Sequence, residues 1–352
     1  MKYKENWEES KQKLMEYWNM ENHDRPLISL QVKNEKMPVR EVIAPEDLYR
    51  QWTDTEYIIN LHRSIFERTL YLGESLPVLS PNLGPDFFGA TMGTEIVFQK
   101  DTSYSVPIIQ DWERADGISF SPENKWWKLM TAMTERFVED AKGDYIVGIT
   151  DMHPGVDGVV SLRGATETCY DMADNPEYVV ELAKRLFDVY QQQLQALHSI
   201  TEKNGTGCSN WSGLWHEELW YMTSCDFICM ISQEMFADYI APLIEQEAKM
   251  LGGKTIFHLD GPGALKHLDA LLDIPEIAGI QWVYGTGQPT AAAWLDVLKK
   301  IQAKNKRIQI NVERDDIPVL VENLRPEGLY LNCAFTPDLE EANAILKSMS
   351  KS

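Results

Sequence analysis

Thr255–Asp260 reads TIFHLD, an apolar run whose end carries two polar side chains at alternate positions. Side chains two residues apart on a strand point to the same side, so His258 and Asp260 are expected to project together. A later run, Gly328–Asn332 (GLYLN), ends directly before Cys333. If both runs are strands of one barrel, their ends bring an imidazole, a carboxylate and a thiol to one mouth, and zinc accepts all three as ligands.

Similar short apolar runs recur along the chain, and longer segments with helical periodicity separate them. The helical segments include 176–200 and 232–251, and the expected strands are 26–32, 78–83, 145–150, 207–210, 227–231, 255–259, 279–283, 308–312 and 329–332. About eight alternations of strand and helix predict a parallel sheet, most simply a closed (β/α)8 TIM barrel. An open doubly wound sheet is the alternative, but no Gly-x-Gly-x-x-Gly loop follows an early strand to support it.

The chain is expected to form one domain over residues 1–352, because no low-complexity linker divides it. Within residues 1–25, Tyr3, Trp7, Leu14 and Trp18 recur at roughly helical spacing with charged residues between them. This pattern predicts an amphipathic helical segment ahead of the barrel.

The charge balance excludes several classes of partner. Lys and Arg total 33 against 54 Asp and Glu, a formal net charge of −21, whereas nucleic acids and membrane surfaces select cationic faces. The first residues, Met1–Trp7, are charged rather than apolar, which is not typical of a secretory signal. The 5 cysteines are scattered and odd in number, which favours reduced thiols and a cytoplasmic location.

In barrels of this kind, catalytic groups follow the carboxyl ends of the strands. The candidates for orienting a substrate or moving its proton are Asp151, His153, His216 and Glu217. Aromatic and amide side chains at other run ends suit a small organic ligand: Trp211, Trp215, Trp282, Tyr284 and Asn82. Structural roles are also open, since a buried histidine can be a hydrogen-bonded core residue and Asp260 can cap the next helix.

Four segments resemble the uroporphyrinogen decarboxylase superfamily. They are His258–Leu265 (HLDGPGAL), Gly279–Gly287 (GIQWVYGTG), Asp226–Pro242 and Leu162–Glu177, and the similarity extends from about Pro26 to Ala344. The resemblance implies a distorted (β/α)8 barrel. It also implies one of two activities, which are porphyrinogen decarboxylation and zinc-dependent methyl transfer between a corrinoid protein and a small molecule.

The N-terminal part of the chain favours the second activity. True decarboxylases carry an Arg-Gln-Ala-Gly-Arg motif after the first strand, which holds the substrate's many carboxylates, whereas this chain has Leu30–Asn34 (LQVKN) there. Without that arginine clamp, a chain of net charge −21 suits a substrate with eight carboxylates poorly.

The methyltransferase branch binds zinc through a His-x-Cys pair and a distant cysteine. The resemblance therefore implies a zinc site at His258, Asp260 and Cys333, with Asp260 standing where that branch has a cysteine. A carboxylate in that place leaves a more Lewis-acidic ion, which suits oxygen-bearing substrates as well as thiols. The implied partner is a separate corrinoid protein.

Two other functions remain open from the residues alone. One is a metal-free lyase or decarboxylase on the same fold. The other is a glycoside-acting enzyme in which Glu217 or Glu218 faces Asp151 or Asp260 across the mouth, with tryptophans as sugar platforms.

Overall fold

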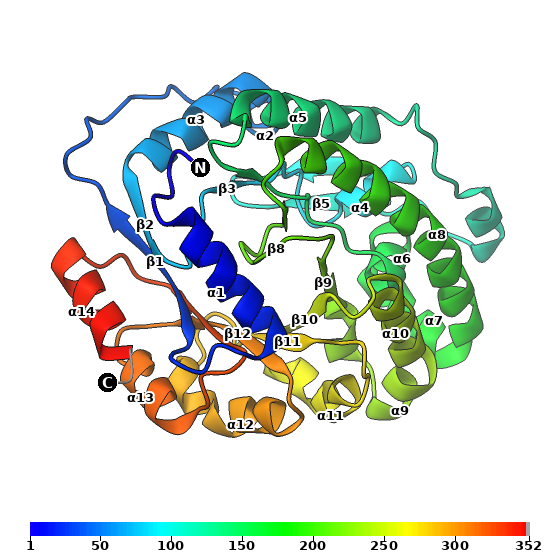
Figure 1. Cartoon of the computed structure of the whole chain (residues 1–352). Helices are drawn as coiled ribbons and strands as arrows, with labels where there is room; N and C mark the ends of the chain where they lie inside the picture. The colour runs from blue at the N-terminus through cyan, green and yellow to red at the C-terminus, as the bar shows by residue number, and fades with distance from the viewer. Residues whose placement is uncertain (350–352) are drawn as a thin grey trace.

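The central feature of the computed structural model, which describes residues 1–349, is a mostly parallel sheet surrounded by helices (Figure 1). Within these residues the main sheet has seven strands in the order β2-β1-β13-β12-β11-β10-β9. Its members are β1 (Leu27–Lys33), β2 (Thr69–Gly73), β9 (Tyr221–Ser224), β10 (Thr255–Asp260), β11 (Gly279–Val283), β12 (Arg307–Val312) and β13 (Leu329–Cys333). All neighbours pair in parallel except β2, which runs antiparallel to β1.

The remaining strands are short. They are β3 (Val78–Leu79), β4 (Glu95–Phe98), β5 (Ser103–Val106), β6 (Ile146–Val147), β7 (Cys208–Ser209) and β8 (Trp215–His216). β3 pairs in parallel with β6, and a parallel bridge joins Ile149 to Asn210 just beyond β7. β4–β5 and β7–β8 are antiparallel hairpins.

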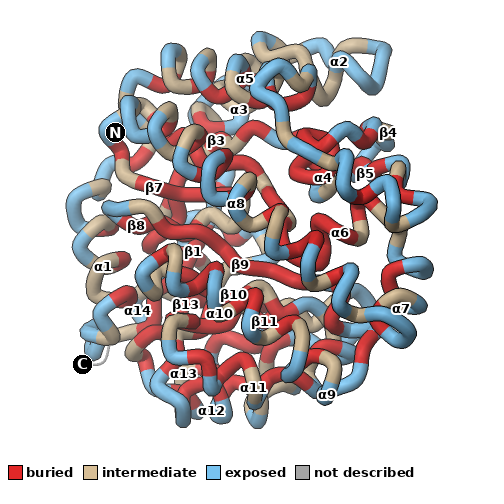
Figure 2. The backbone as a smooth tube through the Cα atoms, turned by 90° about the vertical axis from the view of Figure 1, so that its right-hand side faces the viewer, coloured by how far each residue is buried: buried red, intermediate tan, exposed pale blue. Residues whose placement is uncertain are grey.

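Helices follow the strands and cover the outside of the sheet (Figure 1). They are α1 (Trp7–Asn19), α2 (Leu48–Thr53), α3 (Thr55–Glu67), α4 (Phe87–Thr91), α5 (Lys125–Ala141), α6 (Gly155–Arg163), α7 (Ala165–Asp174), α8 (Pro176–Thr201), α9 (Gln233–Met235), α10 (Ala241–Met250), α11 (Leu268–Leu272), α12 (Leu295–Ala303), α13 (Asp316–Asn323) and α14 (Leu339–Met349). Figure 2 shows that buried residues are concentrated in the strands of the main sheet and that many exposed residues lie on the outer helices. None of these helices is long and apolar enough to cross a membrane.

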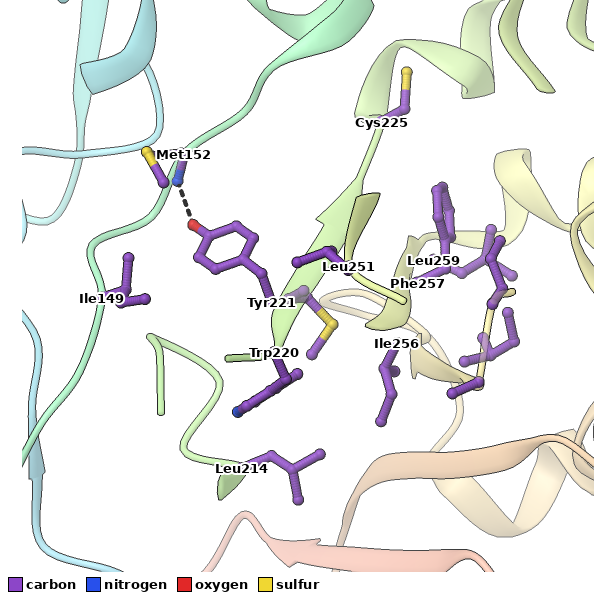
Figure 3. Packing of buried hydrophobic residues seen from close by; sticks show 14 of the residues in the cluster. Ile149, Met152, Leu214, Trp220, Tyr221, Cys225, Leu251, Ile256, Phe257 and Leu259 are labelled. Carbon is purple, nitrogen blue, oxygen red and sulfur yellow. Dashed lines mark hydrogen bonds between the residues drawn. The ribbon is translucent and has the colours of Figure 1, made fainter. Parts of the chain in front are cut away.

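This arrangement is compatible with a TIM-barrel-like fold, but the ring of strands is not closed. Among residues 1–349, no backbone ladder joins β2 to β3 or β7 to β9. Near the second gap, a side chain ties β9 to the segment that follows β6: the Tyr221 hydroxyl donates to the Thr150 carbonyl at 2.7 Å and accepts from Met152 N at 2.8 Å. Figure 3 shows the Tyr221 ring reaching from β9 to Met152. The expectation of a closed barrel is corrected accordingly.

One expected strand is wrong. Residues 227–231 are mostly a 3-10 helix, Asp226–Met230, and the strand of this region is β9, directly before it. The expected helix over 232–251 is present but interrupted, because a π-helical turn, Phe236–Ile240, separates α9 from α10. Pro242 at the start of α10 lacks the N–H that a continuous helix would need there.

Helix α1 covers the amino-terminal end of the strands. Arg307 at the start of β12 donates to the carbonyl of Trp18, and the Trp18 indole donates to the Trp215 carbonyl at 2.8 Å. Ahead of the helix, the buried Lys4 ammonium donates to the Tyr71 and Gly73 carbonyls at 3.0 and 2.6 Å. The helix therefore closes this end of the barrel and leaves the carboxyl ends of the strands for a site.

A buried ion pair ties β1 to the turn after β2. The Arg25 guanidinium donates to both carboxylate oxygens of Glu74 at 2.9 and 2.6 Å, and Ile28 N donates to the same carboxylate at 2.9 Å. Gly73, the residue before Glu74, has a φ of 57°. A Cβ at this position would lie 2.3 Å from the Ile28 carbonyl oxygen, so glycine is required.

We expect Glu74→Ala to destabilise the protein by about 3 kcal/mol, because it leaves the Arg25 charge uncompensated, with only the Pro26 carbonyl as a partner, and the buried Ile28 N–H without a partner. The control is Glu35→Ala, which removes an exposed pair with Lys33 and should cost less than about 1 kcal/mol. Urea unfolding of both variants measures the difference. Equal losses would show that the Arg25–Glu74 pair does not hold β1 in place.

Candidate active site

Three metal-compatible side chains meet at the carboxyl ends of β9 and β10. His258 and Asp260 lie two residues apart on β10, and Asp226 begins the segment after β9. One potential ligand atom from each of the three lies within 4.8 Å of the other two. The parallel register that places Ser224 opposite His258 brings Asp226 beside this group.

A row of amides inside the barrel sets the tautomer of His258. The Ser212 carbonyl accepts from Gln309 Nε2 at 3.2 Å, so Gln309 presents its Oε1, which accepts from Gln281 Nε2 at 3.2 Å. Gln281 Oε1 then accepts the proton of His258 Nδ1. His258 Nε2 is left with a free lone pair, which is the form of histidine that binds a metal ion.

A second group lies beside the first and is built around His153. Its Nε2 faces Asp151 Oδ2 at 3.0 Å, and its Nδ1 faces Asp157 Oδ2 at 3.3 Å and the Ser224 hydroxyl at 3.2 Å. Burial alone would lower the pKa of His153, but the charges and hydrogen bonds of Asp151 and Asp157 outweigh it and raise that pKa well above 6.5. His153 is therefore an imidazolium held between two carboxylates.

Asp157 is the buried anchor of that group. Burial opposes its ionisation, but hydrogen bonds with His153 and with the backbone N–H groups of Asp226 and Phe227 lower its pKa overall. The pKa of Asp226 is raised, first by burial and then by the charge of Asp157. Ionisation of Asp226 is therefore disfavoured in the metal-free protein, and a bound cation would favour the ionised form.

The two groups differ in their fitness for a metal ion. His153, Asp157 and Asp226 also have potential ligand atoms within 4.8 Å of one another. However, both ring nitrogens of His153 are occupied by hydrogen bonds, and an imidazolium has no lone pair to donate. Gln281 holds only Nδ1 of His258, which leaves Nε2 free, and two carboxyl groups lie beside this ring, so Asp226, His258 and Asp260 form the better site for a divalent cation.

A pocket of about 450 Å³ opens beside these groups at the ends of β1, β3, β6 and β7. Asn82, Asp151 and Trp211, all expected at the site, line it. Asn82 Oδ1 accepts from Gly84 N at 2.7 Å and shapes the loop after β3. The ring of Trp211 lies edge-on to His258 at 5.2 Å, so the wall of the pocket also touches the first group.

His216 and Glu217 lie away from this mouth. The β7–β8 hairpin carries the chain back toward helix α1, where the Trp18 ring contacts His216 at 5.2 Å. Glu218 pairs with Lys254, which precedes β10. Trp215 is in the same place, edge-on to Trp7. These residues are at the amino-terminal end of the strands, so the structure separates His216 and Glu217 from Asp151, His153 and Asp260 at the opposite end.

Cys333 and Trp282 point to the outside of the sheet. Asn332 bonds to Asn311 at 2.7 Å, and Asn311 lies two residues beyond Gln309 of the inner amide row. Asn332 therefore faces the inside of the barrel, and Cys333, the next residue on β13, faces the outside. Burial raises the pKa of its thiol to about 12, with the charges of Glu313 and Glu341 adding to the shift, so it stays protonated.

Cys333 joins neither metal-compatible group found within residues 1–349. Trp282 is fully buried against Trp294, between β11 and the helices, and does not line the pocket. Tyr284 follows β11 and is partly exposed.

Sequence reasoning missed Asp226, Asp157 and the amide pair Gln281 and Gln309. On their strands, Gln281 and Gln309 each stand between two buried apolar residues. A single polar residue at such a position can indicate a side chain that faces the inside of the barrel. Asp226 was hidden because β9, whose end it follows, was not recognised as a strand.

The chain is an α/β protein whose fold is compatible with a TIM-barrel-like architecture. No protein-family model and no curated protein matches the sequence. The fold is similar to that of a methyltransferase from Methanosarcina mazei, with a TM-score of 0.62 over 97% of this chain and 98% of that chain. Only 15% of the residues are identical, so the similarity concerns the fold.

We expect the contribution of His153 to stability to fall as pH rises. Its pKa is above 6.5 in the folded protein, so the stabilisation is complete below pH 6.5 and is lost as pH passes the raised value. Urea unfolding of metal-free wild type and His153→Gln, from about pH 6 to about pH 9, measures this difference.

His62 provides a control of opposite sign. Burial lowers its pKa to about 4, so its contribution should be complete above pH 6.5 and fall as pH drops toward 4. If His153→Gln showed the same pH dependence as His62→Gln, His153 would be neutral and the imidazolium assignment would be wrong.

Proposed function

We propose that the protein is a metal-dependent methyltransferase that moves a methyl group between a small substrate and a corrinoid held by a partner protein. The observation that carries the proposal is the group Asp226, His258 and Asp260, in which an imidazole whose Nδ1 is held by Gln281 lies beside two carboxyl groups at the carboxyl ends of β9 and β10. The fold shared with a methyltransferase and the sequence resemblance support it. Zinc is the expected ion.

The divalent ion and the corrinoid would each contribute different chemistry to methyl transfer. A divalent ion at Asp226, His258 and Asp260 supplies Lewis acidity, which makes a substrate heteroatom a better nucleophile or leaving group. A corrinoid supplies a cobalt centre that accepts and returns the methyl group. The donor set of one nitrogen and two carboxylates is harder than a thiolate set, so it favours substrates whose methyl group is on oxygen or nitrogen.

The side chains around the group position the substrate and its proton. The amide row keeps the proton of His258 on Nδ1 and keeps Nε2 directed away from that row. The imidazolium of His153 holds a proton at Nε2 against Asp151 Oδ2, while Asp151 also lines the pocket. This pair can supply a proton to a departing heteroatom or take one from an attacking heteroatom. The Trp211 ring covers the pocket side of His258 and limits water there.

Charge also argues for this substrate class and against a porphyrinogen. Within residues 1–349, the pocket lining contains two aspartates and no lysine, arginine or histidine. A substrate with many carboxylates would find no cationic partner in this wall.

The proposal predicts zinc-dependent demethylation of methylcobalamin by a panel of amine, alcohol and thiol acceptors, followed by the change in cobalamin absorbance. Wild-type protein should hold about one zinc per chain after reconstitution. His258→Ala and Asp226→Asn should lose both zinc and activity, because each removes a ligand, whereas Cys333→Ser should keep both.

The controls separate the alternatives. A wild-type protein that stays free of metal after reconstitution would favour the metal-free lyase. Zinc binding without faster demethylation by any acceptor class would reject methyl transfer while keeping the metal site. Loss of zinc in Cys333→Ser would place the thiol in the site and contradict the structure's orientation of β13.

A further inference from the structure

We propose that the pocket beside the metal group binds a small cationic substrate that also carries a neutral oxygen acceptor, such as an amino ether or amino alcohol. The inference deepens the proposed function and rests on it for the identification of this ligand as the methyl donor or acceptor. The binding chemistry itself rests on side chains whose polar atoms lack partners.

Two hydrogen-bond donors in the pocket wall are free. Asn210 is fully buried, and its Oδ1 accepts from Ser212 N and Oγ at 3.0 and 2.7 Å. This fixes the amide, and the buried Asn210 Nδ2 has no partner within residues 1–349. The indole N–H of the next residue, Trp211, is also buried and has no partner within residues 1–349, and an indole nitrogen can only donate. Buried donors without partners are costly, so a ligand that offers an oxygen acceptor fits them.

A free acceptor lies in the same wall. Asp151 Oδ2 is held by His153 Nε2, whereas Asp151 Oδ1 is buried and has no partner among the described residues. The Ser80 hydroxyl, also in the lining, is likewise unpartnered and can donate or accept. The ligand must therefore present a donor to Asp151 and an acceptor to Asn210 and Trp211.

The local charge selects a cationic donor. His153 neutralises one of its two partners, Asp151 and Asp157, so that group keeps about one net negative charge. Asp101 adds another carboxylate to the lining, which has no basic residue to oppose it. A divalent ion at Asp226 and Asp260 would neutralise that group and leave this side of the pocket negative. An ammonium group at Asp151 satisfies the charge and the hydrogen bond together.

The aromatic wall suits the same ligand. Trp211 and Trp52 both line the pocket. Aromatic faces attract organic cations, including methylated ammonium groups. Trp211 also contacts the His258 ring, so this wall of the pocket adjoins the metal group. The Trp52 indole differs because it already donates to the Gln99 carbonyl at 2.9 Å.

Three matched probes test the inference on metal-free protein by ligand-observed NMR titration: methoxyethylammonium, butylammonium, which lacks the oxygen, and methoxyacetate, which reverses the charge. We expect methoxyethylammonium to bind about tenfold more tightly than either of the others. Asp151→Asn should abolish the preference for the cation over methoxyacetate.

The tryptophans give a matched pair of variants. Trp211→Phe keeps an aromatic ring beside His258 and removes a free donor, so it should weaken methoxyethylammonium by a larger factor than butylammonium. Trp52→Phe removes no free donor and should weaken both amines by the same factor.

Three results would overturn the inference: no binding of methoxyethylammonium, equal binding of methoxyacetate, or an equal effect of Trp211→Phe on both amines. The titration uses neither metal nor corrinoid. Its failure is therefore distinguishable from a failure of methyl transfer, which the demethylation of methylcobalamin measures.

Discussion

The hydrogen-bonded row from His258 through Gln281 and Gln309 to the Ser212 carbonyl is the constraint on which the site depends. It exists because β10, β11 and β12 pair in a parallel register that places His258, Gln281 and Gln309 side by side on the inner face. A backbone carbonyl at one end fixes the direction of every amide in the row. The row thereby keeps the proton of His258 on Nδ1 and leaves Nε2 without a partner from the row.

The long, regular strands of the carboxyl-terminal half could be predicted from the sequence. β10 to β13 lie within a residue or so of the expected apolar runs, because each is buried and bounded by polar turns. The strands between β2 and β10 are harder to predict. β3, β6 and β7 have two residues each, and β9 was not recognised as a strand, so their pairing depends on contacts that no local pattern records. The Tyr221 bridge to Met152 is one such contact.

The site was predictable in part for the same physical reasons. His258 and Asp260 share a face because they are two residues apart on a strand that the sequence identifies. Cys333 also ends a strand, but a single step in the alternation of side chains turns it to the outer face. His216 follows a run end in sequence, yet the β7–β8 hairpin returns it to the opposite end of the barrel. Asp226 takes the third place in the metal group through the packing of β9 against β10.

The central claim is that the metal ligands are nitrogen and carboxylate oxygen, without thiolate. Cobalt(II) in place of zinc tests this directly, because thiolate ligation gives an intense near-ultraviolet charge-transfer band that imidazole and carboxylate ligation lack. We expect about one cobalt per chain, a spectrum without that band, and the same spectrum in Cys333→Ser. A thiolate band in the wild-type protein that disappears in Cys333→Ser would contradict it.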